Sequence, residues 1–442
     1  MLRAALAVSS IAFAAAAQGG SGTAQQAALT LEQAIRLALE RNFDLRKSQY
    51  QALSSGQDLI TARAAILPKL DFNASVSEIR LNGQQYSGGV PIPGATTTNY
   101  STQFAGNVRL QQLVFDGGKW WNNLAAADLN LAASEAGVDE QRLTALYTVE
   151  QRFYELVRAQ RQLKVLGDAA VRSRDQADFT QRLFDGGRAT QADVYAARAN
   201  RDNDEINRLG QEAKVELARQ DLAVTIGADP AEPLAIAEPA AMQQDPSAPP
   251  SPEEAVQKAL AQRPSLKAFA FAAEAQRKSA AAATGDYWPS LTIGGNYSRS
   301  NPEFTVFADP MLNKNSQLIG SVNLSWNIFN GFATKAAVEK ARINVLLAEN
   351  DLMNGRRGVA SDVERAIAQL AVARQQARIA VQSLQTSSEN LRLARTRQQV
   401  GVGTQLEVRD AELKLTQSEL ARANALVDGH EAEAALRRAT GG

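Results

Sequence analysis

Cysteine is absent from the 442 residues, so the chain can form no disulfide and no thiolate metal site, and it offers no cysteine for lipid attachment. Its 47 basic residues are balanced by 47 acidic residues, which excludes the basic field through which proteins bind nucleic acid. Aromatic residues amount to only 6%, whereas alanine and glutamine are abundant. This composition is typical of long helices that pack closely, and not of one globular core.

Histidine occurs once, at His430, in a stretch that lacks the second histidine of a zinc-binding helix. The sequence also contains no nucleophile–base arrangement and no phosphate-binding loop. We therefore expect no metal, no cofactor and no enzymatic activity, and we assign His430 to a solvated helix position.

The first 17 residues have the pattern of a secretory signal peptide. Arg3 is followed by an apolar run from Ala4 to Ala14, and three small residues at 15–17 give a cleavage site. The alternative is an uncleaved membrane anchor, but the run is well short of the ~20 residues that a spanning helix needs. No later stretch is apolar enough to span as a helix, so we expect an exported chain without a helical membrane segment.

What the sequence does contain is a duplication. Leu67-Pro68 recurs as Trp288-Pro289, and Gly187, Thr190 and Val194 recur 214 positions later as Gly401, Thr404 and Val408. A period this long indicates a duplicated half-domain and not a solenoid. We predict a first repeat at 18–226, a proline-rich linker at 227–251 and a second repeat at 252–442.

Each repeat predicts the same order of elements: a helix, a β-hairpin, a long helix and a return helix. Prolines end the helices before the hairpins, because proline cannot continue the hydrogen-bond ladder. Alternating apolar and polar residues then predict strands with one apolar face. The long helices contain no proline and would each span about 100 Å. The predicted ranges are 69–115 and 290–329 for the hairpins, 118–184 and 332–399 for the long helices, and 190–226 and 404–437 for the return helices.

A coiled-coil seam runs along the second long helix, where apolar residues step alternately by four and three positions. The equivalent positions of the first repeat keep the register, with seven of eight apolar. The two shorter helices of each repeat have the combined length of one long helix, so we expect them to stack end to end beside it. The seam residues are Val359, Val363, Ala366, Leu370, Ala373, Ala377, Ala380 and Leu384.

Four strands cannot close a barrel, yet one face of the hairpins is apolar and the other is rich in Asn, Ser, Gln and Arg. If the strands lie in a membrane, every backbone polar group must be paired, so several chains must share one barrel. Two chains would give eight strands and a filled interior, whereas three would give twelve and an aqueous lumen. Trp326 and Tyr297 are then expected at the lipid interface. The alternative is an antiparallel sheet covering a soluble core.

The ordered arrangement of signal peptide, duplicated halves, hairpins, long helices and glycine turns resembles the TolC family of outer-membrane efflux proteins. The resemblance covers the chain from about Leu29 to Arg438. It implies a homotrimer in which a 12-stranded β-barrel, four strands per chain, lies in the outer membrane and continues as a long α-helical coiled-coil tunnel in the periplasm.

In that family the channel is the passive exit duct of a tripartite efflux pump or a type I secretion system. The implied partners are a periplasmic adaptor protein, an inner-membrane transporter and outer-membrane lipid, and the implied trigger for opening is adaptor contact at the periplasmic tips. The alternative function is a soluble periplasmic coiled-coil protein with a structural or adaptor role.

The glycine turns correspond to the periplasmic tips of the family, which close the tunnel and meet the adaptor. On their own, glycines at these positions permit the chain to reverse. Thr190 and Thr404 are candidate N-caps, because an acid follows each three residues later, as in a capping box. The tip residues that the resemblance implies are Gly187, Thr190, Asp193 and Val194 in the first repeat, and Gly401, Thr404 and Val408 in the second.

Glu407 and Asp410 are three residues apart and share one helix face. The resemblance implies that they line the constriction of the tunnel, where a trimer would present six carboxylates that attract cations; a solvated helix face is the alternative. The sequence departs from the family at the latch, because the places of its Tyr and Arg hold Gln398 and Gly403. Asp193 therefore lacks its usual partners, and we consider Arg397 or Arg188 as replacements. Asp410 has only Ala196 as its equivalent, so we expect the two tips to act unequally.

Overall fold

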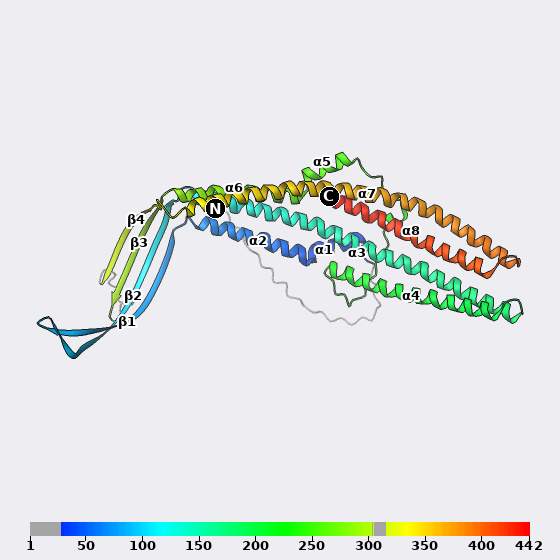
Figure 1. The fold of residues 1–442 in the computed structure, drawn as a ribbon, viewed down its shortest axis with the longest axis horizontal. Coiled ribbons are helices and arrows are strands. Elements are labelled where there is room, and N and C mark those ends of the chain that lie inside the picture. The colour runs from blue at the N-terminus through cyan, green and yellow to red at the C-terminus, as the bar shows by residue number, and fades with distance from the viewer. Residues whose placement is uncertain (1–27, 303, 305–314) are drawn as a thin grey trace, which may run out of the picture.

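The computed structural model describes residues 28–302, 304 and 315–442 as a long bundle of helices with a β-sheet at one end (Figure 1). The predicted signal segment, 1–17, lies outside the described residues. None of the described helices has a stretch long and apolar enough to cross a bilayer. The first repeat contains α1 (Leu31–Arg41), α2 (Phe43–Ala64), β1 (Lys69–Ser87), β2 (Val90–Phe115), α3 (Lys119–Asp185) and α4 (Gln191–Thr225). The second contains α5 (Pro252–Gln262), α6 (Pro264–Thr284), β3 (Ser290–Asn301), β4 (Ser316–Ser325), α7 (Ala333–Gln399) and α8 (Gln405–Thr440).

The two long helices begin in the same way in both repeats. Asp116 Oδ2 accepts a hydrogen bond of 2.8 Å from the first turn of α3, and Asn330 Oδ1 accepts one of 3.3 Å from the first turn of α7. The residue before each helix is left-handed, Gly118 with φ 82° and Phe332 with φ 68°. Each helix then runs for 67 residues without proline, which corresponds to about 100 Å.

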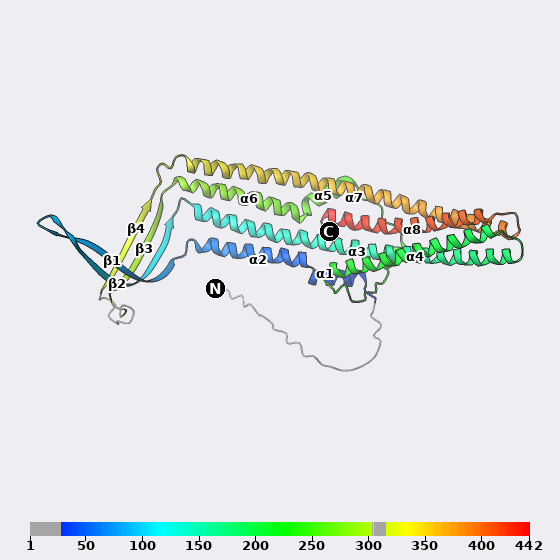
Figure 2. The same ribbon diagram turned by 60° about the horizontal axis from the view of Figure 1, so that its bottom comes forward.

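The helices lie side by side in one layer that is four helices wide (Figure 2). Near the sheet the order is α2, α3, α6, α7 (Figure 2). Toward the far end it is α4, α3, α8, α7 (Figure 1). Thus α2 and α4 both lie along α3, and α6 and α8 both lie along α7, as the helix lengths predict. The shorter α1 packs on α3, and α5 packs on α7 and α8.

The predicted seam is the buried face of α7. Seven of its eight residues are buried, and Leu384 is partly buried. Val359 and Val363 pack with residues of α5 and α6, whereas Ala377 and Ala380 pack with Ala425 of α8. The small alanine side chains let the backbones of these helices approach closely.

The linker between the repeats crosses the bundle as a strap, which we define as residues 227–251. Met242 is buried in the central cluster with Val149 and Phe153 of α3. Ile236 forms a parallel bridge with Leu29, so the strap also holds the start of the described chain.

The prediction that His430 is solvated is wrong, because Tyr154 of α3 packs on its ring, with centroids 6.1 Å apart, and the strap covers the neighbouring residues of α8. His430 is only 5% exposed, and its Nδ1 lies 3.0 Å from Glu433 Oε2. The backbone N–H of Ser247, in the strap, donates a 2.6 Å hydrogen bond to the same carboxylate. A side chain at Gly429 would collide with Pro246, since a Cβ there would lie 2.1 Å from the proline ring.

The four strands form one antiparallel sheet in the order β1-β2-β3-β4. The second hairpin is shorter than the predicted 290–329, because β4 ends at Ser325. That residue pairs with Ser290, the first residue of β3, so later residues have no partner strand to pair with. Residues 303 and 305–314, between β3 and β4, lie outside the described residues.

Candidate functional site

One face of the sheet is apolar across all four strands. The register aligns Phe72, Val108, Tyr297 and Leu318 in one row. Phe72 is 67% exposed and Leu318 is 78% exposed, so the described residues leave this row of the face uncovered. A contiguous exposed apolar face of this kind indicates contact with lipid or another protein. The neighbouring rows on this face include Leu70 with Leu110, Ile293 with Val322, and Leu291 with Leu324.

The apolar face is bounded at both ends. Glu78 is its first charged side chain on β1, and Arg299 is its first on β3. Tyr297 lies one row inside Arg299, and Trp326 lies at the end nearest the helices, where its Nε1 donates to the carbonyl of Tyr287 at 3.1 Å. Both aromatic residues therefore stay candidates for the lipid interface.

The opposite face of the sheet is polar. Asp71 lies opposite Arg109, and Asn107 Nδ2 donates to Asn296 Oδ1 at 3.4 Å. A groove of about 360 Å³ lies on this face between β2, β3 and β4. A polar, hollowed face behind an apolar one is the arrangement of a water-filled lumen. The groove is lined mainly by Asn107, Arg109, Thr292, Asn296, Ser321 and Asn323.

The sheet is open at β1 and at β4, because within the described chain each of these strands pairs on one side only. In a bilayer an unpaired edge would leave backbone N–H and C=O groups without partners, at several kcal/mol for each group. A sheet that is apolar on one face and open at both edges can therefore lie in lipid only after strands of other chains complete it.

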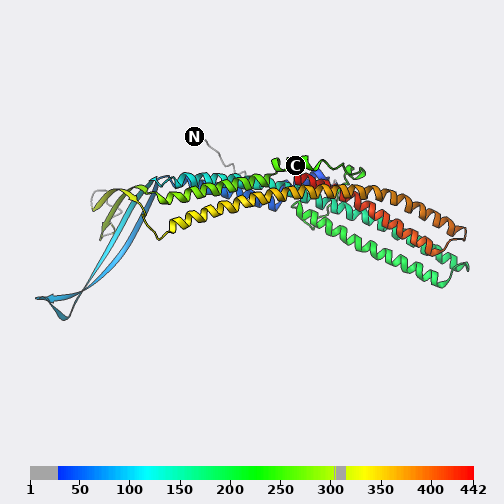
Figure 3. The ribbon, with the colours of Figure 1, turned by 45° about the horizontal axis from the view of Figure 1, so that its top comes forward.

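At the end remote from the sheet, two tip turns close two helical hairpins (Figure 3). The first tip turn (residues 186–190) joins α3 to α4, and the second (residues 400–404) joins α7 to α8. These are the turns that the duplicated glycines predict.

The first tip turn reverses through Gly187, which has φ 73°. The N–H of Gly187 donates to the carbonyl of Phe184 at 2.9 Å, and the N–H of Arg188 donates to that of Leu183 at 2.7 Å. These two bonds satisfy the last carbonyls of α3, as in other glycine-terminated helices. The turn therefore requires the left-handed backbone that glycine adopts without strain.

Thr190 and Asp193 form a complete capping box at the start of α4. The Asp193 N–H donates to Thr190 Oγ1 at 3.2 Å, and the Thr190 N–H donates to the Asp193 carboxylate at 2.9 Å. The Thr190 hydroxyl also donates to this carboxylate at 2.7 Å. These hydrogen bonds, first that of the hydroxyl and then that of the backbone, lower the pKa of Asp193. Asp193 is therefore a cap, and its carboxylate is used within its own turn.

The second tip turn has the same shape with different side-chain contacts. Gly401 has φ 80°, and the N–H groups of Val402 and Gly403 both donate to the carbonyl of Arg397 at 3.0 Å. Thr404 accepts a 3.2 Å hydrogen bond from the Glu407 N–H. The Glu407 carboxylate does not close the box; it lies 3.5 Å from Nε of Arg397.

Besides Asp193, the candidate tip residues that carry side chains are two threonines and two valines. Thr190 and Thr404 lie at the turns as helix caps. Val194 and Val408 are buried, Val408 in a cluster with residues of α7 and α8. The valines therefore hold the hairpins together, and the turns present the outer surface of the tips.

Glu407 and Asp410 are both exposed, and each lies beside a cation of its own hairpin. Asp410 Oδ2 lies 2.6 Å from Lys414 Nζ, one helical turn further along α8. Arg397, considered above as a replacement partner for Asp193, pairs with Glu407 instead. Per chain the four side chains have no net charge.

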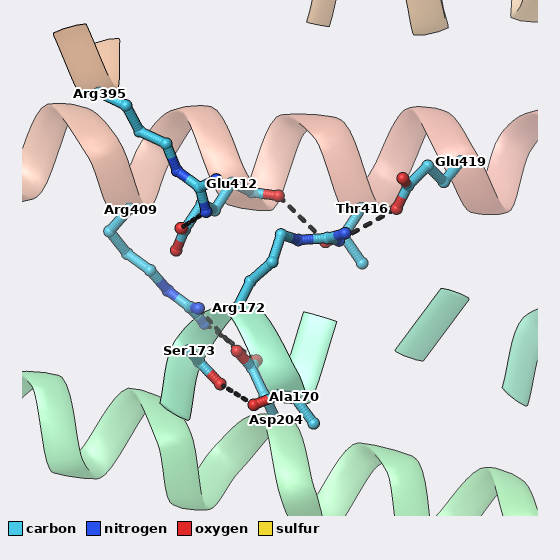
Figure 4. A network of polar contacts seen from close by, with 9 residues as sticks. All are labelled: Ala170, Arg172, Ser173, Asp204, Arg395, Arg409, Glu412, Thr416 and Glu419. Atoms are coloured by element: carbon cyan, nitrogen blue, oxygen red, sulfur yellow. Dashed lines mark hydrogen bonds and ion pairs between the residues drawn. The ribbon is translucent and has the colours of Figure 1, made fainter. Parts of the chain in front are cut away.

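A polar seam between the two hairpins was missed by the sequence reasoning (Figure 4). Arg409 of α8 binds Asp204 of α4 through two hydrogen bonds of 2.7 and 3.0 Å. Arg172 of α3 donates to Glu419 of α8 at 3.0 Å. Comparison of the two repeats could have indicated this seam. The residue equivalent to Asp204 is Ser418 and the residue equivalent to Arg409 is Tyr195, so each charge occurs in one repeat only.

The model of a family described as outer membrane efflux protein matches residues 34–228 and 255–442, one match in each repeat. The chain belongs to the outer membrane efflux protein family. Outer membrane efflux protein BepC of Brucella suis biovar 1 (strain 1330) is 26% identical over 426 residues, which cover 94% of this chain and 86% of BepC. Protein CyaE of Bordetella pertussis (strain Tohama I) is 25% identical over 355 residues, covering 78% of this chain and 70% of CyaE.

Solved structures of outer-membrane channels share the fold of this efflux-family chain. The Campylobacter jejuni CmeC outer membrane channel superposes with a TM-score of 0.78 at 18% identity, covering 93% of this chain and 85% of CmeC. The open state of the Neisseria gonorrhoeae MtrE outer membrane channel superposes with a TM-score of 0.76 at 21% identity, covering 93% and 89%. The predicted fold class, a β-barrel continued by a helical tunnel, is confirmed.

The family and the fold together indicate which end of the molecule lies in the membrane and which lies in the periplasm. The chain is an exit channel of the outer membrane, with its sheet in the membrane and its helices in the periplasm. The tip turns are then the periplasmic ends of the helical wall. The alternative of a soluble periplasmic structural protein does not agree with this membership.

Proposed function

We propose that three copies of this chain form one channel, a passive conduit without enzymatic activity that opens when a periplasmic adaptor meets the tips. The observation that carries the proposal is the sheet, which has two open edges and one face that is apolar up to Glu78 on β1 and Arg299 on β3. Two chains would give an eight-stranded barrel whose interior is filled by side chains. Three chains give twelve strands, and the polar groove then faces a lumen wide enough for export.

The helical wall supports the same assembly. Exposed apolar side chains remain on α7 at one margin of the helix layer, and on α2 and α4 at the other. A ring of copies in the same orientation brings these two margins together and joins the β4 edge of each copy to the β1 edge of the next. The exposed apolar residues include Ile343, Leu346 and Leu347 on α7, Tyr50 and Leu53 on α2, and Ile206 and Leu209 on α4.

The proposed adaptor contact consists of the tip residues that reach the surface of the turns. Gly187, Thr190 and Asp193 form it on the first tip, and Gly401 and Thr404 form it on the second. We infer that Val194 and Val408 support this surface from inside the hairpins. In this proposal an inner-membrane transporter supplies the energy for export.

Fractionation and bilayer recording test the proposal. Outer-membrane fractions should contain a trimer that dissociates to monomers on heating, and the purified trimer should conduct ions in planar bilayers. Recovery of the chain only as a monomer in the soluble periplasm would overturn the proposal. A trimer that never conducts, with or without periplasmic extract, would overturn the channel mechanism.

A further inference from the structure

Near the tips the wall consists of two separately packed helical hairpins. In the α7/α8 hairpin, Leu391, Ala394, Val408 and Leu415 form one apolar cluster. In the α3/α4 hairpin, α4 runs along α3 and buries Val194 and Ala197. Each hairpin therefore has apolar contacts of its own and can move as a unit.

The contact between α4 and α8 is of a different kind. Arg409 and Asp204 form a bidentate ion pair, and their side chains are only 17% and 11% exposed. Among the described residues no other ion pair joins these two helices. Bidentate arginine–carboxylate pairs are among the stronger hydrogen-bonded contacts and fix the geometry of both partners.

Further polar contacts continue this link on both sides. Toward the tips, Gln405 Nε2 donates to Oγ1 of the buried Thr180 of α3 at 2.6 Å. Away from the tips, Arg172 donates to Thr416 and Glu419 of α8, both at 3.0 Å (Figure 4). The hairpins are therefore connected by a row of polar contacts over several turns of α8.

A polar contact of this kind suits an interface that must separate. Parting an apolar interface exposes surface to water, at about 25 cal/mol for each Å². Parting a buried ion pair hydrates both charges, which offsets much of the lost attraction. Removing one partner is different, because it leaves a buried charge uncompensated. The pair therefore fixes the arrangement of the hairpins without making their separation prohibitive.

We propose that Arg409 and Asp204 are the positioning residues that hold the α7/α8 hairpin against the α3/α4 hairpin, and that their separation accompanies opening of the tips. The inference rests on the proposed function and assigns the control of opening to the hairpin interface. The turns themselves offer no such link, because Asp193 is occupied by its own cap and Arg397 by Glu407.

Planar-bilayer recordings of paired variants test the inference. Asp204→Asn with Arg409→Gln removes both charges and leaves none buried alone, and this double variant should conduct several-fold more than wild type. Exchange of the two charges, Asp204→Arg with Arg409→Asp, should return conductance toward wild type. The matched control is Glu389→Gln with Arg392→Gln, an exposed pair within α7 that should change nothing. Each variant is first checked for the heat-sensitive trimer.

A second measurement keeps the inference testable if the charge variants fail to assemble. Since the chain has no cysteine, Thr180→Cys with Gln405→Cys gives one defined pair for a short reducible crosslinker across the interface. Crosslinked trimers should stay at the lowest conductance until they are reduced. Two outcomes would overturn this inference alone. One is a crosslinked trimer whose conductance is the same before and after reduction; the other is an Asp204→Asn with Arg409→Gln variant that conducts like wild type. A wild type that does not conduct would overturn the proposed function as well.

Discussion

At the residue scale, Asp193 and Glu407 occupy equivalent positions in the two repeats but make different contacts. Asp193 closes its capping box, whereas Glu407 lies beside Arg397. The residue equivalent to Arg397 in the first repeat is Leu183, which offers no charge. Two differences between the repeats, the longer side chain of Glu407 and the cation at the end of α7, therefore accompany the change from a helix cap to an ion pair.

The two threonine caps should differ in what their removal costs. Thr190→Ala removes both hydrogen bonds of the threonine hydroxyl, one accepted from the Asp193 N–H and one donated to its carboxylate, and keeps only the bond from the backbone N–H of residue 190. We therefore expect it to destabilise the first turn of α4 by about 1 kcal/mol. Thr404→Ala removes a single hydrogen bond and should have a smaller effect on α8. Hydrogen exchange of the amides in the two first turns measures both. Thr190→Ser keeps the hydroxyl and should leave exchange unchanged; equal effects at the two tips would contradict the difference.

The same cap predicts a dependence on pH. The pKa of Asp193 is lowered by its hydrogen bonds from Thr190, so the folded state favours the ionised carboxylate. Its stabilisation is present above the ordinary pKa of 3.8 and is lost as pH falls through the lowered folded value. Protection of the α4 amides from exchange should therefore decline below about pH 4 in wild type, while an Asp193→Asn variant should show no such step.

Gly403 occupies the place where the family resemblance implies an arginine of the latch, and an arginine there should not form that latch in this chain. A Cβ at Gly403 would lie 2.8 Å from the Gln398 nitrogen and 3.0 Å from Cβ of Arg397. Gly403→Arg should therefore distort the second tip turn, by about 1–3 kcal/mol if overpacking is typical. Limited proteolysis should show faster cleavage at this turn. Val402→Arg adds the same charge at an exposed neighbouring site and should cleave as wild type; a Gly403→Arg variant that resists cleavage equally well would refute the steric argument.

At the element scale, the strap acts as a clamp where the two repeats meet. Its residues reach both α3, through buried Met242, and α8, through the bond from Ser247 to Glu433. Arg161 of α3 adds hydrogen bonds to the strap at Glu238 and at the carbonyl of Met242. Since α3 and α8 belong to different hairpins, the strap fixes them at mid-length and leaves the tip halves to move.

Gly429→Ala tests this clamp. The added methyl would collide with Pro246, so the strap must shift and the protein should lose about 1–3 kcal/mol. Loss of helical circular dichroism on heating should occur at a lower temperature. Gly167→Ala on α3 is the control, because a Cβ there meets nothing within 4 Å, and it should be neutral or stabilising by about 0.5–1 kcal/mol. Identical melting of the two variants would show that the strap does not depend on this contact.

The elements themselves follow from local patterns, and the contacts between them do not. Absence of proline predicts α3 and α7, and alternation predicts the hairpins, because these signals arise within a few residues. Burial of His430 depends on packing against Tyr154, which is distant in sequence, and the end of β4 depends on where its partner begins. Arg409 and Asp204 are 205 positions apart, and a charged residue on a helix normally predicts a solvated face. In the sequence, Arg409 and Asp204 differ from ordinary solvated charges only because the equivalent positions of the other repeat are uncharged.

At the scale of the whole molecule, the sheet and the helix layer of one chain both leave surfaces that further copies of the chain can cover. The sheet lacks partners at β1 and β4, and the helix layer leaves apolar side chains exposed on α2, α4 and α7. One ring of copies satisfies the hydrogen bonds of the strands and the apolar surfaces of the helices together. In the proposed trimer, the duplication would give six similar hairpins, of which alternate members carry Asp410 and Arg409.

The acids of the second tip predict how such a trimer selects ions. Glu407 and Asp410 are balanced in each chain by Arg397 and Lys414, so the tips combine six acids with six bases. Glu407→Gln with Asp410→Asn removes the acids and leaves Arg397 and Lys414 without their acidic partners. The reversal potential in a salt gradient should therefore shift toward anion selectivity. Arg397→Gln with Lys414→Gln should shift it toward cations by a similar amount. Glu205→Gln, which removes a half-buried acid paired with Arg208 on α4, is the control and should leave the potential unchanged. If neither double variant moves the potential, these four side chains lie on a solvated outer face, and the constriction of the channel must be formed by other residues.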